Sequence, residues 1–431
     1  MRTVRLHLVA TLAAAGWSAA AAQQLDTLTI ERAVALALQH QPSLGAASGT
    51  IQAYDAIARQ ARAAFLPSVA FSASDTRTGG TILLTPSLPP ALRTYTSYSA
   101  ALQGALTIWD FGKSSGRQVE SDLLADAAVT AFDSAREIVA LNTEVAYLAF
   151  LESRRVVSVN EEALANSARH LAQTRAFFIT GRRPQLDVTK AEVDSLNANV
   201  SLIQARNAYR VSKLQLENTM GVHPANEYVA ADSSSVPATY TTLEEARSDA
   251  LRNRPEVIAA QARLGSARAA VTAAWGQHLP TISATGGYTW NGYAFPLLSR
   301  WNAGLTFTLP IFQGWALDAG VQLAEANAAI AQSSLDVLTE GVLLEVEQEW
   351  LAIREASERA VATAKLVRES EENLNLVERQ YAAGVATSLD ESDARLTLAN
   401  SQITDIQAQY DYRTAAIRLR RAMGLTVVPG G

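Results

Sequence analysis

The sequence predicts a mainly α-helical chain that is built twice, each half carrying one long helical hairpin and one β-hairpin. Three observations lead to this fold class. The chain repeats itself internally, it holds two proline-free stretches far longer than an ordinary helix, and it holds two pairs of segments in which polar and apolar residues alternate.

The repeat is visible in ordered pairs of matching residues. Pro42 matches Pro255, and further along Gly181 matches Gly384 at a slightly shorter offset, so the first half carries an insertion after Pro67. A duplicated unit of about 200 residues is much longer than a solenoid repeat. It therefore indicates two halves related by a pseudo-two-fold axis.

The first 22 residues have the zones of a secretory signal peptide. Two arginines precede an apolar run from Leu6 to Ala15, and small residues precede Gln23. A short buried helix is the alternative. The chain has no cysteine, so neither disulfides nor a cysteine-linked lipid are expected. Its net charge of −6 argues against nucleic acid as a partner.

Long helices are predicted at residues 113–180 and 315–383, because both stretches are rich in helix formers and lack proline. At about 1.5 Å per residue each would span roughly 100 Å and must pack along other helices. Return helices are predicted at 185–220 and 388–423, the second opened by a capping box of Ser388 and Glu391. Shorter helices at 42–65 and 255–277 would be stacked end to end with the return helices to match each long helix.

Strands are predicted at about 67–78 and 95–109, and at about 280–291 and 301–312, with one apolar and one polar face. This pattern fits a membrane barrel with lipid outside, and equally a half-buried soluble sheet. A barrel would need several chains, since small membrane barrels have about eight or more strands. No later apolar stretch approaches the roughly 20 residues of a membrane helix. Aromatic residues near the hairpin ends would form its girdle: Tyr95, Tyr98, Tyr288, Trp290, Tyr293 and Trp301.

No enzyme chemistry is predicted. The five histidines are scattered, and the sequence contains no zinc-protease, nucleotide-binding or nucleophile motif. Catalytic residues, cofactors and metal sites are therefore all expected to be absent.

The ordered elements resemble the TolC-type outer-membrane efflux proteins over nearly the whole chain after the signal. The match is carried by Leu66-Pro67 and Leu279-Pro280 before the strands, by the run 309–314 after them, and by the two tips that end in Gly181 and Gly384. The resemblance implies repeats at 23–221 and 242–431, joined by an equatorial linker at 222–241 that reads as irregular. It also implies a homotrimer with a twelve-stranded barrel in the outer membrane and a twelve-helix tunnel in the periplasm.

The same resemblance implies docking to a periplasmic adaptor and an inner-membrane pump. The adaptor would meet six tip residues: Gly181, Arg182, Arg183, Gly384, Val385 and Ala386. Asp390 and Asp393 match the acidic residues that narrow the family's entrance, although two such residues can also simply complement the helix dipole.

This chain departs from some relatives at the gate. It has Ala386 where they place an arginine, and Ser195-Leu196 stand where they have the Tyr-Asp pair that this arginine contacts. The resulting prediction is a passive exit duct of a tripartite pump that exports small molecules. The alternatives are a duct for type I protein secretion and a soluble periplasmic coiled-coil protein.

Overall fold

The computed structural model describes residues 26–82, 91–222, 228–232 and 242–425. The predicted signal peptide and most of the predicted linker lie outside them. In chain order the elements are β1 Asp26–Leu28, α1 Ile30–His40, α2 Pro42–Arg62, the short 3-10 helix η1 Ala63–Phe65, β2 Ser68–Ile82, β3 Ala91–Trp109, α3 Lys113–Ile179, α4 Gln185–Met220, β4 Tyr228–Ala230, α5 Leu243–Asn253, α6 Pro255–Gly276, β5 Thr281–Gly292, β6 Leu298–Thr308, α7 Ala316–Ala382 and α8 Ser388–Ala422.

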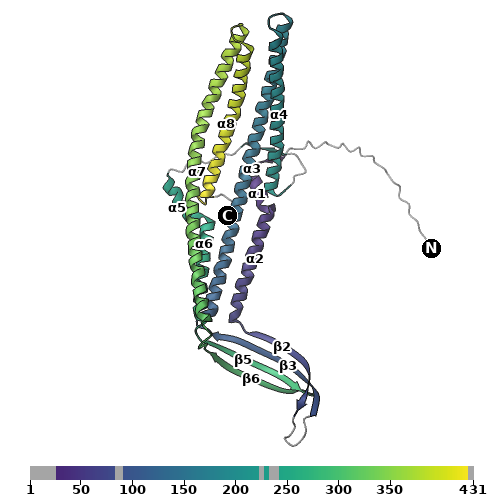
Figure 1. The fold of residues 1–431 in the computed structure, drawn as a ribbon, viewed down its shortest axis with the longest axis vertical. Helices are drawn as coiled ribbons and strands as arrows, with labels where there is room; N and C mark the ends of the chain where they lie inside the picture. Colours follow the sequence, from purple (N-terminus) through teal and green to yellow (C-terminus); the bar gives the residue numbers. More distant parts are fainter. Residues whose placement is uncertain (1–25, 83–90, 223–227, 233–241, 426–431) are drawn as a thin grey trace, which may run out of the picture.

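The molecule is a long shaft of helices with a sheet at one end and two helical tips at the other (Figure 1). Helices α3 and α7 run the length of the shaft. Helices α2 and α4 pack along α3, and α6 and α8 pack along α7. In the half nearest the sheet the packing order is α2, α3, α6, α7, which leaves α2 and α7 at the two edges. The predicted fold class of duplicated helical hairpins and two β-hairpins is confirmed.

Each return helix ends at a glycine that lies in close contact with the backbone at the junction between two shorter helices. Gly221 has φ +68°, and a Cβ placed there would lie 2.8 Å from the carbonyl oxygen of His40, where α1 meets α2. Gly424 repeats the arrangement with the same φ against the backbone of Asn253, where α5 meets α6. Only glycine combines this left-handed conformation with so close an approach.

Replacing Gly221 with alanine is therefore expected to destabilise the protein more than the same change at Gly181. Both residues have nearly the same φ, +68° and +69°, but a Cβ at Gly181 has nothing within 4 Å. The left-handed conformation alone costs about 1–2 kcal/mol, and the steric overlap adds about 1–3 kcal/mol at Gly221 only. Denaturant unfolding of the two variants measures the difference, and equal losses would contradict it.

The described part of the linker contains a strand that the sequence did not predict. Strand β4 pairs in parallel with β1, matching Leu28 to Ala230. Beneath them Tyr147 of α3 is fully buried, and its hydroxyl donates to the carbonyl oxygens of Leu28 (2.8 Å) and Ala231 (2.7 Å). The prediction of a wholly irregular linker was wrong at this point, because a buried tyrosine holds the chain in extended form.

A partly buried ion network joins four helices at the corresponding level of the second half. Arg254 is 4% exposed and pairs with Glu345 of α7 at 2.5 Å and with Glu256 at 3.4 Å. Arg421 of α8 pairs with the same two carboxylates, and Ser134 of α3 donates to Glu256 at 2.9 Å. Burial raises the pKa of Glu256, but the nearby hydrogen bonds and the two arginines outweigh it, so the pKa lies below its usual range.

The four long strands form one antiparallel sheet in the order β2-β3-β5-β6. Strands β2 and β3 reach further toward their hairpin turn than predicted, and β5 and β6 are joined across 293–297. The prediction that the last strand continues to residue 312 was wrong, because β6 ends at Thr308. Pro310 has no N–H to donate, so the ladder stops before it.

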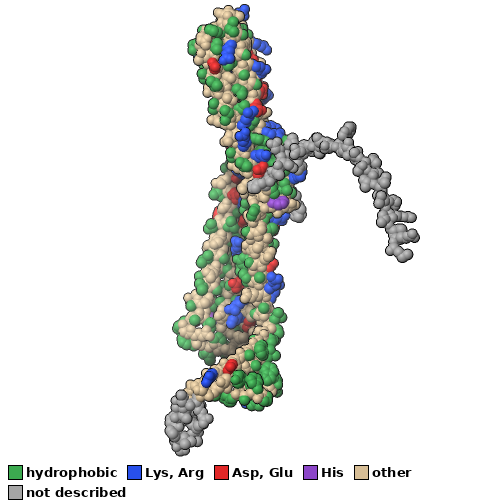
Figure 2. All heavy atoms as spheres, turned by 90° about the vertical axis from the view of Figure 1, so that its right-hand side faces the viewer, with side chains coloured by type: hydrophobic (Ala, Val, Ile, Leu, Met, Phe, Trp, Pro, Cys, Tyr) green, Lys and Arg blue, Asp and Glu red, His purple; other side chains and the backbone are tan. Residues whose placement is uncertain are grey.

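The register places the apolar side chains of neighbouring strands on one face. Phe71 pairs with Leu102, Leu102 with Tyr288, and Tyr288 with Trp301, while Ile282 pairs with Phe307. Figure 2 shows hydrophobic side chains gathered over this end of the molecule, in contrast to the mixed surface of the shaft. Most polar residues of the same strands lie on the opposite face, since side chains alternate along a strand. Asp75 and Arg77 are exceptions, because their even spacing from Phe71 places them on the apolar face, toward the turn of the first hairpin.

Most of the predicted girdle residues belong to the apolar face. Tyr98, Tyr288, Trp290 and Trp301 alternate onto it. Tyr95 does not, because it is three residues from Tyr98 and therefore points to the opposite face. Its ring instead contacts that of Tyr293, which lies just beyond β5, with ring centroids 5.4 Å apart. The first hairpin is the longer one, so Tyr95 and Tyr98 lie level with the turn of the second hairpin rather than at their own.

Candidate functional site

The two helical tips have the same backbone geometry. Gly181 and Gly384 both have positive φ, +69° and +78°. In each tip the residue after the glycine donates its N–H across the turn, Arg182 to Phe177 and Val385 to Gln380, both at 2.9 Å. This is the usual glycine-ended helix. The duplicated sequence thus produces two equivalent ends that project from the shaft.

Exposed apolar side chains cover these ends and form an apolar crown. Ile179 is 82% exposed and Val385 is 78% exposed, and Phe178, Leu186 and Leu389 are also exposed. Such a cluster on a thin tip costs free energy in water and is typical of a contact surface. Arg182 is exposed beside it, whereas Ala386, predicted as a contact residue, is buried at 8% exposure.

Arg183, one of the predicted adaptor contacts, links the two tips within one chain. Its guanidinium lies over the ring of Tyr381 at 4.3 Å, and its Nη2 donates to the Tyr381 carbonyl oxygen at 3.3 Å. Asp187 lies 3.9 Å from the same guanidinium. Arg183 occupies in the first repeat the position that Ala386 occupies in the second.

Asp390 caps helix α8. Thr387 donates to its carboxylate from the backbone N–H at 2.8 Å and from the hydroxyl at 2.6 Å, and the Asp390 N–H donates back to the hydroxyl of Thr387 at 3.2 Å. The predicted capping box of Ser388 and Glu391 was wrong by one residue. Hydrogen bonds from Thr387 hold the pKa of Asp390 below its usual range.

Asp393 lies one turn further along α8 and is exposed, as is Asp390. Its carboxylate is not part of the capping box, which consists of Thr387 and Asp390, and Thr397 donates to the backbone carbonyl of Asp393 at 2.7 Å. The two carboxylates share one face of the helix near its start. At the matching positions of the first repeat, Asp187 is paired with Arg183 and Lys190 is cationic. Only the second tip therefore presents a pair of carboxylates.

The seam between the two helical hairpins is bridged by polar contacts close to the tips. Ser392 of α8 donates to Asp194 of α4 at 2.6 Å. His170 of α3 faces Glu391 of α8, with Nδ1 and Oε1 3.1 Å apart. Ser195-Leu196, which stand where some relatives have a Tyr-Asp pair, lie next to Asp194. Leu196 is 59% exposed, and Asp194 makes the contact.

A second level of exposed aromatic side chains lies where the strands join the helices, and the sequence analysis missed it. Trp109 and Phe111 precede α3, Phe312 and Trp315 precede α7, and Trp275 ends α6. Each is between 43% and 72% exposed. The available signal was the repeat itself, since Trp109 and Phe312 are matching positions that both carry an aromatic ring.

Helix α7 exposes a heptad stripe that sequence reasoning also missed. Large apolar residues recur every seventh position in its half nearest the sheet and are between 54% and 74% exposed: Leu323, Ile330, Val337, Leu344 and Leu351. The residues of α7 buried against its own chain, such as Val321 and Val342, lie on the other side of the helix. A seam of this spacing is typical of a helix that packs along another helix.

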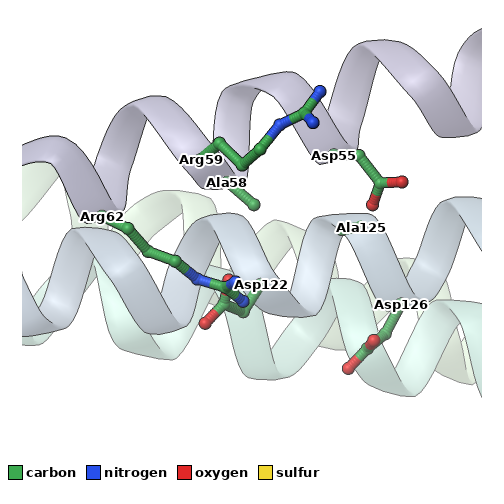
Figure 3. Close-up of a pocket in the computed structure, with 7 residues that line it drawn as sticks. All are labelled: Asp55, Ala58, Arg59, Arg62, Asp122, Ala125 and Asp126. Atoms are coloured by element: carbon green, nitrogen blue, oxygen red, sulfur yellow. The ribbon is translucent and has the colours of Figure 1, made fainter.

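An open groove of about 290 Å³ lies between α2 and α3 (Figure 3). Arg62 pairs with Asp122 at 2.9 Å at one end of it, and Asp55, Arg59 and Asp126 line the rest. The groove carries both signs of charge and is wide open to solvent. Among the residues described, no group of histidine, aspartate or glutamate side chains could hold a metal ion.

The family described as outer membrane efflux protein matches residues 33–222 and 246–425. The chain belongs to this family. Its two matched segments coincide with the two structural repeats. The efflux protein is similar to outer membrane protein TolC of Escherichia coli, with 26% identity over 347 residues that cover 76% of this chain and 69% of the relative.

Two further comparisons agree. The toluene efflux pump outer membrane protein TtgI of Pseudomonas putida is 25% identical over 403 residues, which cover 90% of this chain and 83% of the relative. A crystal structure of a membrane protein from Pseudomonas aeruginosa has the same fold, with a TM-score of 0.83, 22% identity and coverage of 93% of this chain and 91% of that one.

This efflux protein therefore resides in the outer membrane and serves as the efflux channel there. The family consists of channel proteins rather than enzymes. None of the described helices is long and apolar enough to cross a membrane.

Proposed function

We propose that three copies of this chain form a passive exit duct, closed by a twelve-stranded barrel in the outer membrane and continued by a twelve-helix tunnel in the periplasm. The observation that carries the proposal is the four-stranded sheet with open edges at β2 and β6. Unpaired backbone groups cost several kcal/mol each in lipid, so these edges need partners. Pairing β6 of one copy with β2 of the next supplies them.

The helical shaft supports the same closure. The heptad stripe of α7 lies at one edge of the shaft, and α2 lies at the other. The exposed face of α2 is built largely of small residues, including Gly45, Gly49 and Ala53. Large side chains of α7 from one copy fit against such a surface on the next, as knobs fit into holes. Strand β6 and helix α7 of one copy would then both contact the same neighbour, through its β2 and its α2.

Two aromatic levels support the position of the sheet in the membrane. Tyr98, Tyr288 and Trp301 lie on the apolar face toward the hairpin turns, and Trp109 and Trp315 lie at the opposite ends of the strands. Tyrosine and tryptophan favour the two membrane–water interfaces. The apolar face between the levels would contact lipid, and the polar face would line a water-filled lumen.

The tips would then form the periplasmic entrance and meet the adaptor of an inner-membrane transporter. The exposed apolar crown of Ile179 and Val385, flanked by Arg182, is the surface for this contact. The duct performs no catalysis, uses no cofactor and takes its energy from the transporter. Small molecules are the proposed cargo, because the Pseudomonas putida relative is the outer membrane protein of a toluene efflux pump.

Asp390 and Asp393 are proposed to narrow the entrance, where three copies would bring six carboxylates together. Changing either to asparagine is expected to lower cation-over-anion selectivity several-fold, because a ring of like charges in a narrow aqueous passage attracts cations. Changing both should also remove block by trivalent cations applied from the tip side. Planar-bilayer recordings of the purified trimer measure both effects.

The two single variants separate a pore role from a capping role. Asparagine keeps an oxygen that can accept the bonds from Thr387, and Asp393 has no cap to lose. Asp336→Asn, which removes an exposed charge from the middle of α7, is the control and should change nothing. Unchanged selectivity in the Asp393→Asn variant would mean that the constriction lies elsewhere.

A further inference from the structure

His170 is a buried imidazole in the seam between the two helical hairpins. It lies on α3, about three turns before Gly181, and its side chain is 3% exposed. Its Nδ1 is 3.1 Å from Oε1 of Glu391, which lies on α8 of the other hairpin and is equally buried. Histidine is the side chain whose charge ordinarily changes between pH 5 and 8. A titratable contact therefore joins the two hairpins near the tips.

The other charged groups around this contact include more carboxylates than cations. Arg395 of α8 bonds Glu391 at 2.7 Å and also Glu378 of α7 at 2.7 Å. Burial raises the pKa of Glu391, but His170 and Arg395 outweigh it, so the pKa lies below its usual range. Among the residues described, two carboxylates thus share one guanidinium. The cluster has one negative charge in excess when the imidazole is neutral, and it is balanced when the imidazole is protonated.

The remaining face of His170 is closed by Tyr381 of α7, whose ring centroid lies 5.7 Å from that of the imidazole. The other side of the Tyr381 ring carries the guanidinium of Arg183, which in turn faces Asp187 of α4. Both ring nitrogens of His170, Oε2 of Glu391 and the Tyr381 hydroxyl are buried without a hydrogen-bond partner among the described residues, so His170 and Glu391 are joined by proximity at 3.1 Å and not by an aligned hydrogen bond. Buried polar groups without a partner cost free energy. Opening the seam would let water bond to them and would recover part of that cost.

The two hairpins are joined across the seam by fewer interactions than join the helices within each hairpin. Within each hairpin the helices pack along their whole shared length, α3 with α4 and α7 with α8. Across the seam near the tips the described polar links are His170–Glu391, Arg183–Tyr381 and Ser392–Asp194. The last two depend on a guanidinium and on a neutral hydroxyl group, and neither of these donors changes its charge near neutral pH. The histidine is the link that changes.

We propose that His170 makes closure of the tips dependent on pH: the imidazolium binds Glu391 across the seam and holds the hairpins together in acid, and loss of the proton loosens them. The proposal rests on the proposed function, in which the tips form the entrance of the duct. Because closure takes up a proton, acid favours the closed arrangement. One proton per chain changes the ratio of closed to open by at most about tenfold per pH unit.

The test measures tip separation directly. The chain has no cysteine, so spin labels attached at Arg182→Cys and Val385→Cys report only on the two tips. Distances are measured by pulsed electron paramagnetic resonance at pH 5.5 and pH 8, in trimers diluted with unlabelled chains. We expect a longer-distance population that grows several-fold at pH 8. His170→Gln, which keeps a donor for Glu391 but cannot be charged, should show the pH 8 distribution at both values.

Two further variants keep the result interpretable. Glu391→Gln removes the charge that the imidazolium meets and should also abolish the response. His278→Gln is the matched control, because His278 is a partly buried histidine 3.6 Å from Asp318 but lies at the sheet end of the shaft. It should respond as the natural chain does. A pH-independent distribution in the natural chain, or a full response in His170→Gln, would overturn the proposal.

Conductance in planar bilayers separates this proposal from the proposed function. A channel that forms in the bilayer while tip distances ignore pH would refute the role of His170 and leave the duct intact. A protein that forms no channel at either pH would refute the duct, whatever the distances do.

Discussion

Aspartate at both Val337 and Leu344 of α7 is expected to abolish the trimer while leaving the single chain folded. Both side chains are more than half exposed in the single chain, so the substitutions break nothing within it. In the ring they would lie in the seam with α2 of the next copy. Burying five large apolar side chains there contributes on the order of 10 kcal/mol per interface before the entropy of association is subtracted. Two buried carboxylates would cancel most of that.

Ala329→Asp is the matched control for this variant. Ala329 is exposed on the same helix one residue before Ile330, a step of about 100° around the axis, and therefore lies off the stripe. Its variant should assemble normally. The mass of the detergent-solubilised complex, measured by light scattering, distinguishes one chain from three. A normal trimer with aspartate at both stripe positions would refute the proposed packing of α7 on α2.

Arg254→Ala is expected to destabilise the chain by about 3–5 kcal/mol, because it leaves Glu256 and Glu345 facing each other with half of their positive charge removed. Arg247→Ala is the control. Arg247 makes a comparable pair with Glu347 at 2.8 Å, but its side chain is 35% exposed, so the loss should stay below about 1 kcal/mol. Denaturant unfolding followed by tryptophan fluorescence measures both.

The pH dependence identifies the cause. Glu256 has a lowered pKa in the folded chain, so it contributes stability above its usual pKa that is lost as the pH falls through the folded value. Removing Arg254 reduces that contribution. The difference between the natural chain and Arg254→Ala should therefore be constant above pH 4.5, the ordinary pKa of this carboxyl group, and shrink as the pH falls below that value. A difference that does not change with pH would point to lost packing instead of lost charge.

Local signals explain what the sequence predicted well. The absence of proline from 113 to 180 and the glycines at 181 and 384 determine where helices continue and turn, and both act through the backbone of the residues concerned. Alternation predicted the strands for the same reason. The end of β6 was missed because the pattern continues through Leu309, although Pro310 interrupts the hydrogen-bond ladder.

Contacts between distant segments explain what the sequence could not predict. Thr387 with Asp390 and Ser388 with Glu391 fit the same capping pattern, one residue apart. The choice between them depends on His170, because Glu391 is buried against it and is not available to cap the helix. Likewise, nothing near Arg183 in the chain indicates Tyr381, which lies almost 200 residues away and supplies the surface on which the guanidinium rests.

The unlike edges of the sheet have a genetic consequence. In the proposed ring each chain joins one neighbour through β2 and the other through β6, so every contact is head to tail. A chain damaged only along β6 would still bind an intact neighbour through β2, and the ring that it entered could not close. In a cell that makes both versions, the damaged copy would trap intact chains in dead-end assemblies. Such a mutation would behave as dominant, whereas one that simply unfolds the chain would be recessive.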